Sequence, residues 1–348
     1  MIPLARTGGR ARASLRWGIG AVLVAALVVL GGLGAWRYFS SAPAPQARTS
    51  VVVTVKPGAT ARDVADLLQQ AGVIRSAWAF LILSARGNLD ARLRPGSYRM
   101  SPAWSLATVL QHLAHDDILV YRVTIPEGFT VHDIVRRLVA SGVSTRAALE
   151  AALKTGVPGM TAPKGVRTAW EGFLFPDTYL IPYGSTPAAV VRMMWQDFES
   201  RTQSLRRQLP PGEGVWTWVT LASIVQAEDK RPADAPLIAA VFSNRLAIGM
   251  PLQSDATVRY ALDGRVAGAL SLKDLTVASP YNTYLNKGLP PGPIDCPGMV
   301  ALRAALHPAH VGYLYFVATP SGQDLFADTY QQHEQNVARV AAMQKGGS

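Results

Sequence analysis

Val53-Thr-Val-Lys-Pro-Gly-Ala-Thr60 returns seventy residues later as Val123-Thr-Ile-Pro-Glu-Gly-Phe-Thr130. Each copy reads as a strand, a turn that contains glycine and a threonine N-cap, and each continues into an amphipathic helix pattern that closes at Gly72 or Gly142. A match of this length in one register predicts two related strand–turn–helix units. From about residue 145 to 345, helical and strand-like stretches alternate without regular βαβ spacing, so we predict an α+β fold.

The first copy of this repeat also has a possible binding role. Its strand followed by Lys56-Pro-Gly-x-Thr60 and a helix resembles the opening of LysM modules, which are small folds that bind N-acetylated glycans. The resemblance implies a small LysM-like α+β subdomain over residues 50–120. The alternative is that Pro-Gly-x-Thr simply makes a strand-to-helix turn, as it does in unrelated folds.

The N-terminal segment has the composition of a membrane span. Residues 18–35 are uncharged and almost wholly Val, Leu, Ala, Ile and Gly, and Trp17 and Trp36 flank them. About 20 apolar residues cross the hydrocarbon layer, and tryptophan prefers the membrane interfaces. We therefore predict a basic cytoplasmic tail at 1–16, a single transmembrane helix at 17–39, a linker at 40–49 and a folded part outside the cytoplasmic membrane. A cleaved signal peptide is the alternative, although this apolar run exceeds the usual length of about 7 to 15 residues.

Charge and motifs exclude several function classes. The chain of 348 residues has a formal net charge of +11, and four of its arginines (Arg6, Arg10, Arg12, Arg16) lie in an acid-free N-terminal stretch. No zinc-finger, helix-turn-helix or RNA-binding signature accompanies this charge, so we do not expect nucleic acid as a partner. The sequence also contains no GxGxxG, GxxxxGK[ST], HExxH, GxSxG or paired CxxC. Nucleotide-binding, zinc-peptidase and common serine-hydrolase functions are therefore excluded, and we expect no cofactor and no metal.

Cys296 is the single cysteine of the chain and lies in the Pro/Gly-rich stretch Pro293-Ile-Asp-Cys-Pro-Gly298. A cysteine nucleophile needs a histidine and an orienting group nearby. We interpret Cys296 as a structural loop residue.

The stretch Val215-Trp-Thr-Trp-Val-Thr-Leu-Ala-Ser-Ile-Val-Gln-Ala-Glu228 predicts a helix with an apolar stripe. At about 100° per residue, Glu228 follows Leu221 and Val225 on the same face, so its carboxyl would emerge at the end of a hydrophobic surface. Such a site raises the pKa of a carboxyl group by desolvation, as a general acid near neutral pH requires. The alternative is a helix that ends in solvated charges, and Asp229 lies close to the same stripe.

Two segments downstream are dense in hydrogen-bonding side chains, Pro251-Leu-Gln-Ser-Asp-Ala-Thr-Val-Arg-Tyr260 and Ser279-Pro-Tyr-Asn-Thr-Tyr284. Amide, carboxylate and hydroxyl groups bind sugar hydroxyls, and tyrosine rings suit the apolar faces of sugars. The Gly/Pro-rich loop at 288–294 follows them. Each piece alone could be an ordinary turn or helix cap, but together they predict a carbohydrate-binding cleft.

Seven ordered motifs carry a resemblance to a known family: Glu171-Gly-Phe-Leu-Phe-Pro-Asp-Thr-Tyr179, Leu221-Ala-Ser-Ile-Val-x-x-Glu228, Asn244-Arg-Leu-x-Ile-Gly-Met250, Leu252-Gln-Ser-Asp-x-Thr-Val-x-Tyr260, Tyr281-Asn-Thr-Tyr284, Gly288-Leu-Pro-Pro-Gly-Pro-Ile294 and His307-Pro308. In order and spacing they resemble the YceG-like family of endolytic murein transglycosylases (MltG type). The resemblance runs from about residue 50 to 343. It implies a larger α+β catalytic domain at 121–345, with the second repeat copy at 121–143 inside it.

The resemblance also implies the reaction and the site. It implies a lyase that cuts the bond between N-acetylmuramic acid and N-acetylglucosamine in nascent peptidoglycan strands, leaves 1,6-anhydro ends and so ends strand elongation. It implies Glu228 as the catalytic acid/base, and the predicted substrate-binding side chains are Gln253, Ser254, Asp255, Tyr281, Asn282, Tyr284 and Glu171. The implied partners are the peptidoglycan strands, the cytoplasmic membrane, and penicillin-binding and other wall-synthesis proteins.

Two departures from the family pattern bear on this expectation. Many members carry Glu-x-Glu at the end of the helix, whereas this chain has Gln226 at the first position, and the family often has Asn where Cys296 stands. Two other functions therefore stay open. One is a hydrolytic muramidase with Asp255 or Glu171 as a second carboxylate, and the other is a non-catalytic, membrane-tethered peptidoglycan-binding scaffold.

Overall fold

The computed structural model describes residues 8–87, 93–115, 117–212, 214–266 and 268–346. Within these residues it is a mixed α+β protein with three separate two-stranded sheets, so the predicted α+β class is confirmed. The chain forms two compact units. The first ends at Val120 and also takes in Pro182–Gly184, and the second consists of Tyr121–Ile181 and the chain from Ser185 onward.

The N-terminal element is a single long helix, α1 (Gly8–Ser40). Its stretch Val22–Ser40 is long and apolar enough to cross a membrane, and none of that stretch is buried in the protein. A signal sequence would pass the same test of length and composition. Part of the predicted basic tail, including Arg6, lies outside the described residues.

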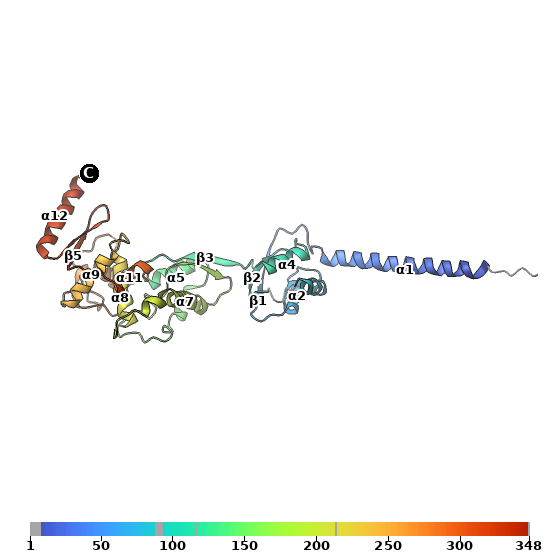
Figure 1. Cartoon of the computed structure of the whole chain (residues 1–348), viewed down its shortest axis with the longest axis horizontal. Helices are drawn as coiled ribbons and strands as arrows, with labels where there is room; N and C mark the ends of the chain where they lie inside the picture. The colour runs from blue at the N-terminus through green and yellow to red at the C-terminus, as the bar shows by residue number, and fades with distance from the viewer. Residues whose placement is uncertain (1–7, 88–92, 116, 213, 267, 347–348) are drawn as a thin grey trace, which may run out of the picture. The chain divides into compact units, whose positions relative to one another are not determined.

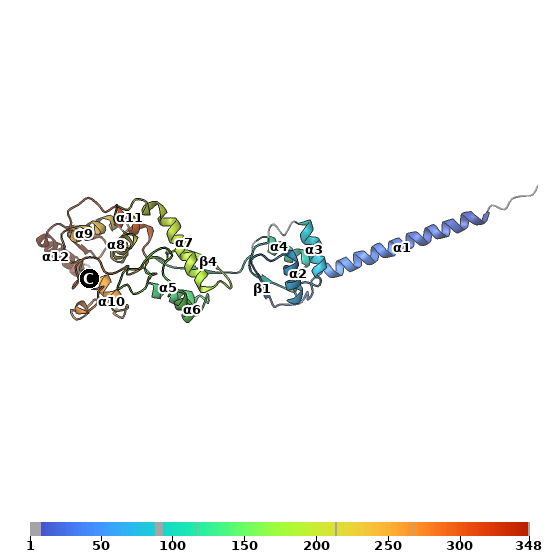
Figure 2. The same ribbon diagram turned by 90° about the horizontal axis from the view of Figure 1, so that it is seen from below.

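The first unit continues as a small α+β fold. Strand β1 (Val51–Val55) pairs antiparallel with β2 (Gly96–Met100), and Val53 lies opposite Tyr98. Helices α2 (Ala61–Gln70), α3 (Ala77–Arg86) and α4 (Leu106–Ala114) pack around this pair (Figure 2). Alternating strand residues and one face of each helix form its core, which includes Val53, Val55, Val64, Leu68, Phe80, Tyr98 and Leu113.

The predicted repeat is confirmed at its two helix starts. Thr60 caps α2, and Thr130 caps α5 (Val131–Ala140). In each case the threonine side chain accepts from the backbone N–H three residues later, and the Asp63 or Asp133 carboxylate accepts from the threonine N–H. This reciprocal capping box satisfies backbone donors that a helix start leaves unpaired.

The two helices also end alike. Gly72 and Gly142 have φ values of 69° and 73°, and the next residue in each copy donates its N–H to a leucine carbonyl five positions back. The left-handed glycine lets the last carbonyls find donors. The sequence repeat is therefore a repeat of local hydrogen bonding.

The second unit is mainly helical, with two short β-ribbons. The elements in chain order are β3 (Val120–Thr124), α5, α6 (Arg146–Ala152), β4 (Thr178–Pro182), α7 (Pro187–Arg206), α8 (Val215–Glu228), α9 (Ala235–Ala247), α10 (Asp255–Ala261), the 3-10 helix η2 (Asp274–Thr276), α11 (Met299–Leu306), β5 (Tyr315–Ala318), β6 (Asp324–Ala327) and α12 (Tyr330–Gly346). Strand β3 pairs with β4, and β5 pairs antiparallel with β6. Helix α12 lies beside the β5–β6 hairpin (Figure 1).

Helix α8 lies at the centre of this unit. The predicted apolar stripe is buried, but so is every residue from 218 to 225, because α9, α11 and the loop at 288–298 cover its other sides. Its buried polar groups are paired: Trp218 donates from Nε1 to the Leu302 carbonyl at 2.8 Å, and Ser223 Oγ accepts from the Ile294 N–H at 3.0 Å. The stripe prediction was therefore too narrow, and α8 is a core helix.

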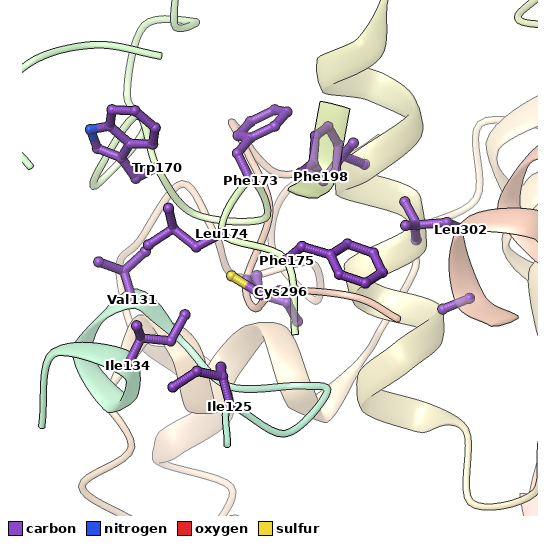
Figure 3. Close-up of a cluster of buried hydrophobic side chains, with 14 of the residues drawn as sticks. Ile125, Val131, Ile134, Trp170, Phe173, Leu174, Phe175, Phe198, Cys296 and Leu302 are labelled. Carbon is purple, nitrogen blue, oxygen red and sulfur yellow. The ribbon is translucent and has the colours of Figure 1, made fainter. Parts of the chain in front are cut away.

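Cys296 lies in the loop before α11 and belongs to the core. It is fully buried, and Figure 3 shows its sulfur among Ile125, Leu174 and Phe175. Its backbone exchanges two hydrogen bonds with the turn before α5, to Phe129 O and from Gly128 N. Burial raises the pKa of its thiol well above the usual value, which disfavours the nucleophilic thiolate. The structural interpretation of Cys296 is therefore confirmed.

Candidate active site

Glu228 is the last residue of α8, where the buried part of the helix gives way to the surface. Asp229 leaves the helical conformation with ψ 115° and closes the last turn by donating its N–H to the Val225 carbonyl at 2.9 Å. Glu228 is half-buried, and its Oε1 accepts a hydrogen bond from Ser254 Oγ at 2.6 Å. The carboxyl thus lies where apolar packing ends, as the sequence predicted.

Ser254 is held by a buried network of hydroxyl groups. It is 2% exposed, directly precedes α10, and donates its N–H to Thr283 Oγ1 at 3.1 Å. The Thr257 hydroxyl lies 2.7 Å from the Ser254 carbonyl, to which it donates, and 2.8 Å from the Thr283 hydroxyl. Because all three side chains are buried, the group that contacts Glu228 is fixed before any ligand binds.

Gln253 has a strained backbone next to this contact. Its φ is 51°, in the left-handed region, which costs a residue with a side chain roughly 1–2 kcal/mol. Its N–H donates to the Thr283 carbonyl at 3.2 Å, and its side chain is exposed. The hydrogen bond to Thr283 helps to keep this backbone conformation, in which Gln253 is exposed next to the buried Ser254.

Asp255 and Tyr284 form the outer part of the site. The Tyr284 hydroxyl donates to Asp255 Oδ1 at 2.7 Å, and the Tyr284 N–H is held by Asn282 Oδ1 at 3.0 Å. Asp255 is exposed and Tyr284 is half-buried. Both side chains are therefore within reach of a ligand at the surface.

The pKa of the Glu228 carboxyl is raised above its ordinary value. Burial is the main cause, and the nearby negative charge of Asp255 adds to it, whereas the hydrogen bond from Ser254 lowers the pKa. The partial negative charge at the C-terminal end of α8 also disfavours the carboxylate. Glu228 is thereby suited to keep its proton at a pH where an ordinary glutamate has lost it.

Other carboxyl groups near this helix end also have raised pKa values. Burial raises the pKa of Glu127 and of Asp229, and it raises the pKa of Asp324 on β6 to about 6, with Asp234 as the next cause. Sequence reasoning missed Asp324, because it lies almost 100 residues beyond α8 in a hairpin without a recognisable motif. Together these groups make the surroundings of Glu228 strongly acidic.

Four of the predicted substrate-binding residues are buried: Ser254, described above, and Asn282, Tyr281 and Glu171. Asn282 is 0% exposed, and its amide donates to the Leu275 and Val277 carbonyls. The Tyr281 hydroxyl accepts from the Arg167 N–H at 3.3 Å. Both residues belong to the buried framework that carries Tyr284, and their contact with substrate stays a prediction.

Glu171 is also buried and is 3% exposed. Its Oε1 accepts from the Val131 N–H at 2.8 Å, and its Oε2 accepts from the Tyr260 hydroxyl at 2.9 Å. Burial raises its pKa to about 7. Both oxygens bind protein groups in the core, so Glu171 joins α5 to α10, and its contact with substrate stays a prediction.

Gln226 occupies the position where the family pattern often has a first glutamate. Its Oε1 accepts from the Gly298 N–H at 2.9 Å, at the start of α11. Two residues before Glu228 on a helix, it points about 200° around the axis from that carboxyl. Gln226 therefore fixes the loop that precedes α11, whereas the Glu228 carboxylate accepts from the Ser254 hydroxyl.

Sequence reasoning also missed two supporting residues. Thr283 lies inside the quoted Tyr281-Asn-Thr-Tyr284 motif and organises Ser254. Arg245 lies inside the Asn244-Arg motif, is 7% exposed and donates to the Leu252 carbonyl at 2.6 Å, directly before Gln253. Membership in these motifs was the available signal, but their role depends on partners that the sequence does not show.

The sequence of the chain was compared with models of known protein families. A model of the YceG-like family matches residues 53–339, which is most of the chain and includes every residue of the site. The chain belongs to the YceG-like family. As a member of that family it is 30% identical over 322 residues to the endolytic murein transglycosylase of Bacillus subtilis, with 86% of this chain and 88% of that protein covered.

Other members of the YceG-like family agree with this. The endolytic murein transglycosylase of Streptococcus pneumoniae is 27% identical, and the match covers 90% of this chain and 63% of that longer protein. A crystal structure of a YceG-like protein from Listeria monocytogenes superposes with a TM-score of 0.57 at 31% identity, over 83% of this chain and 99% of that one.

Proposed function

We propose that this protein is an endolytic lytic transglycosylase of peptidoglycan. It cuts the β-1,4 bond between N-acetylmuramic acid and N-acetylglucosamine in nascent strands and so ends their elongation. The observation that carries the proposal is the half-buried Glu228 carboxyl with its raised pKa, held by Ser254 at 2.6 Å, in a chain of the YceG-like family. The related proteins named above as endolytic murein transglycosylases support the same activity.

The proposed reaction uses Glu228 twice. The protonated carboxyl donates its proton to the glycosidic oxygen as that oxygen leaves C1 of the muramic residue. The resulting carboxylate then removes the proton of the C6 hydroxyl, whose oxygen bonds to C1 and closes the 1,6-anhydro ring. The proton count of the enzyme is restored without water, and burial of the carboxyl favours both its initial protonation and the exclusion of water.

Substrate contacts in this proposal come from the exposed part of the site. Gln253, Asp255 and Tyr284 provide amide, carboxylate and aromatic groups beside Glu228, and these groups suit sugar hydroxyls and ring faces. Ser254 orients Glu228 instead of binding sugar, because it is buried and its hydroxyl donates to the carboxyl.

The proposed location is the cytoplasmic membrane, with α1 as a single-pass anchor and the folded part outside. The apolar stretch Val22–Ser40 and the arginine-rich start of the chain support this orientation. The first unit, with its strand, Pro57-Gly58 turn and Thr60-capped helix, is proposed as a LysM-like element that binds glycan. Penicillin-binding and other wall-synthesis proteins are the proposed protein partners.

The experiment that tests the function is mass spectrometry of muropeptides released from peptidoglycan by the full-length protein in detergent. We expect anhydro-muramyl ends from the parent and none from Glu228→Gln, which keeps the size of the side chain but removes the acid. Asp229→Asn is the matched control, because it removes the adjacent carboxyl and should keep anhydro products. Reducing ends from the parent would favour the muramidase, and uncut strands would favour the scaffold.

A further inference from the structure

Helix α3 in the first unit is apolar on its outer side as well as on its inner side. Ala79, Phe80 and Ser84 face the core of this unit and are buried. On the other side Trp78 is 63% exposed, and Ile82 follows it one helical turn later. A single exposed tryptophan is common on protein surfaces, but Trp78 and Ile82 lie on one face of a helix that also contacts α1.

This helix lies directly beside the end of α1. Arg75, two residues before α3, donates from Nη2 to the Ala42 and Pro43 carbonyls at 3.0 Å each. Its guanidinium also lies 4.6 Å from the centre of the Tyr38 ring, in the last turn of α1. Helices α1 and α3 are in contact, and Figure 2 shows them side by side at this junction.

The segment after α1 is therefore fixed to the first unit. Trp36 packs against the core of that unit, and the Ala44 N–H donates to the Pro102 carbonyl at 3.0 Å. Arg75 and Trp36 thus set the distance between α3 and the last turns of α1. Those turns carry Trp36 and Tyr38, and tryptophan and tyrosine are enriched at membrane interfaces.

We propose that the outer face of α3 docks on the surface of the lipid bilayer that α1 spans, with Trp78 in the interface. The inference rests on the proposed anchor, and it adds a second contact between the first unit and the membrane. Tryptophan with an apolar neighbour one turn away is suited to the headgroup and acyl boundary. The exposed Arg86 in the last turn of α3 can reach lipid phosphates from the same helix.

The test measures membrane depth with nitroxide labels on the full-length protein in liposomes of phosphatidylethanolamine and phosphatidylglycerol. Labels are placed one at a time through Trp78→Cys, Ile82→Cys, Leu27→Cys and Arg99→Cys. The native Cys296 is fully buried, and the parent protein treated with the same label gives the background. Accessibility to oxygen, which partitions into lipid, is compared with accessibility to a water-soluble nickel chelate.

The control positions separate this inference from the anchor itself. Leu27 is 69% exposed on α1 and reports the anchor, and Arg99 is an exposed residue of β2 and reports the water-exposed surface of the first unit. The Trp78→Cys substitution could itself weaken the contact with the membrane. Ile82→Cys keeps Trp78, so its label reports the depth of the same helix face with the tryptophan present.

We expect the labels at 27, 78 and 82 to favour oxygen, with chelate accessibility at 78 and 82 at least threefold below that at 99. A label at 27 in lipid with labels at 78 and 82 as open to the chelate as 99 would overturn the docking and keep the anchor. Labels at 78 and 82 shielded from both reagents would mean a protein partner and would also overturn it. A label at 27 open to the chelate would overturn the anchor and the docking together.

Discussion

Replacing Ser254 by alanine tests how the proposed acid is controlled. The variant removes the hydroxyl that donates to Glu228 Oε1 at 2.6 Å and leaves the backbone bonds of Ser254 to Thr283 and Thr257 in place. A hydrogen bond to a charged group contributes about 1.5–3 kcal/mol, against about 1 kcal/mol for a neutral pair. The bond therefore stabilises the carboxylate more than the acid, by about 1 kcal/mol.

Ser254→Ala should change both the pH dependence and the rate of the reaction. Without the bond the pKa of Glu228 rises further, because Ser254 is a group that lowers it. Activity requires the protonated acid at the start, so the alkaline limb of the pH–rate profile moves to higher pH. The turnover rate below that limb falls about tenfold, since about 1.4 kcal/mol of orientation and carboxylate stabilisation is lost in the second step.

The assay is the rate of anhydro-end formation from pH 5 to 10, with thermal unfolding measured in parallel. Ser223→Ala is the matched control, because it removes another buried hydroxyl associated with α8, which accepts from the Ile294 N–H at 3.0 Å. It should lower stability without moving the alkaline limb. A folded Ser254→Ala protein whose limb stays in place or moves to lower pH would refute the reasoning.

Two further predictions concern the remaining carboxyl groups. Asp255→Asn should keep anhydro products in muropeptide mass spectrometry and move the alkaline limb to lower pH, because the Asp255 charge raises the pKa of Glu228; hydrolytic products would instead support a second catalytic carboxylate. For Glu171, burial places the folded pKa at about 7, above its ordinary 4.5, so the folded protein holds this proton more tightly than the unfolded chain. That stabilisation is fully present below about pH 4.5 and is lost as the pH rises through 7. In urea unfolding, Glu171→Gln should therefore lose about 2–3 kcal/mol less stability between pH 5 and pH 8 than the parent, and equal losses would contradict the assignment.

Structural features that depend on residues close together in the chain could be predicted from the sequence. The two threonine caps, their aspartate partners three residues on and the closing glycines were readable because each hydrogen bond spans only a few residues. Helix α8 and its end at Glu228 were readable from apolar content and from the proline that follows. The long apolar stretch of α1 was readable for the same reason.

Burial could not be read from the sequence alone. Glu171, Tyr281 and Asn282 have the same donor and acceptor groups as residues that bind sugars, and only the structure shows that those groups are used inside the protein. The apolar stripe of α8 was too narrow for a related reason. A helix pattern shows which face is apolar, but not how many other elements will cover the remaining faces.

The sequence by itself determined the local units, the long apolar N-terminal helix and, through ordered motifs, the position of the candidate acid. Only the tertiary structure decided what surrounds that acid, because the decisive bonds join residues far apart in the chain. Ser254 lies 26 residues from Glu228, Thr283 lies 29 residues from Ser254, and Tyr260 lies 89 residues from Glu171. Such contacts form when packing excludes water and brings polar groups together at fixed distances, so the pKa of a carboxyl group is a property of the folded protein.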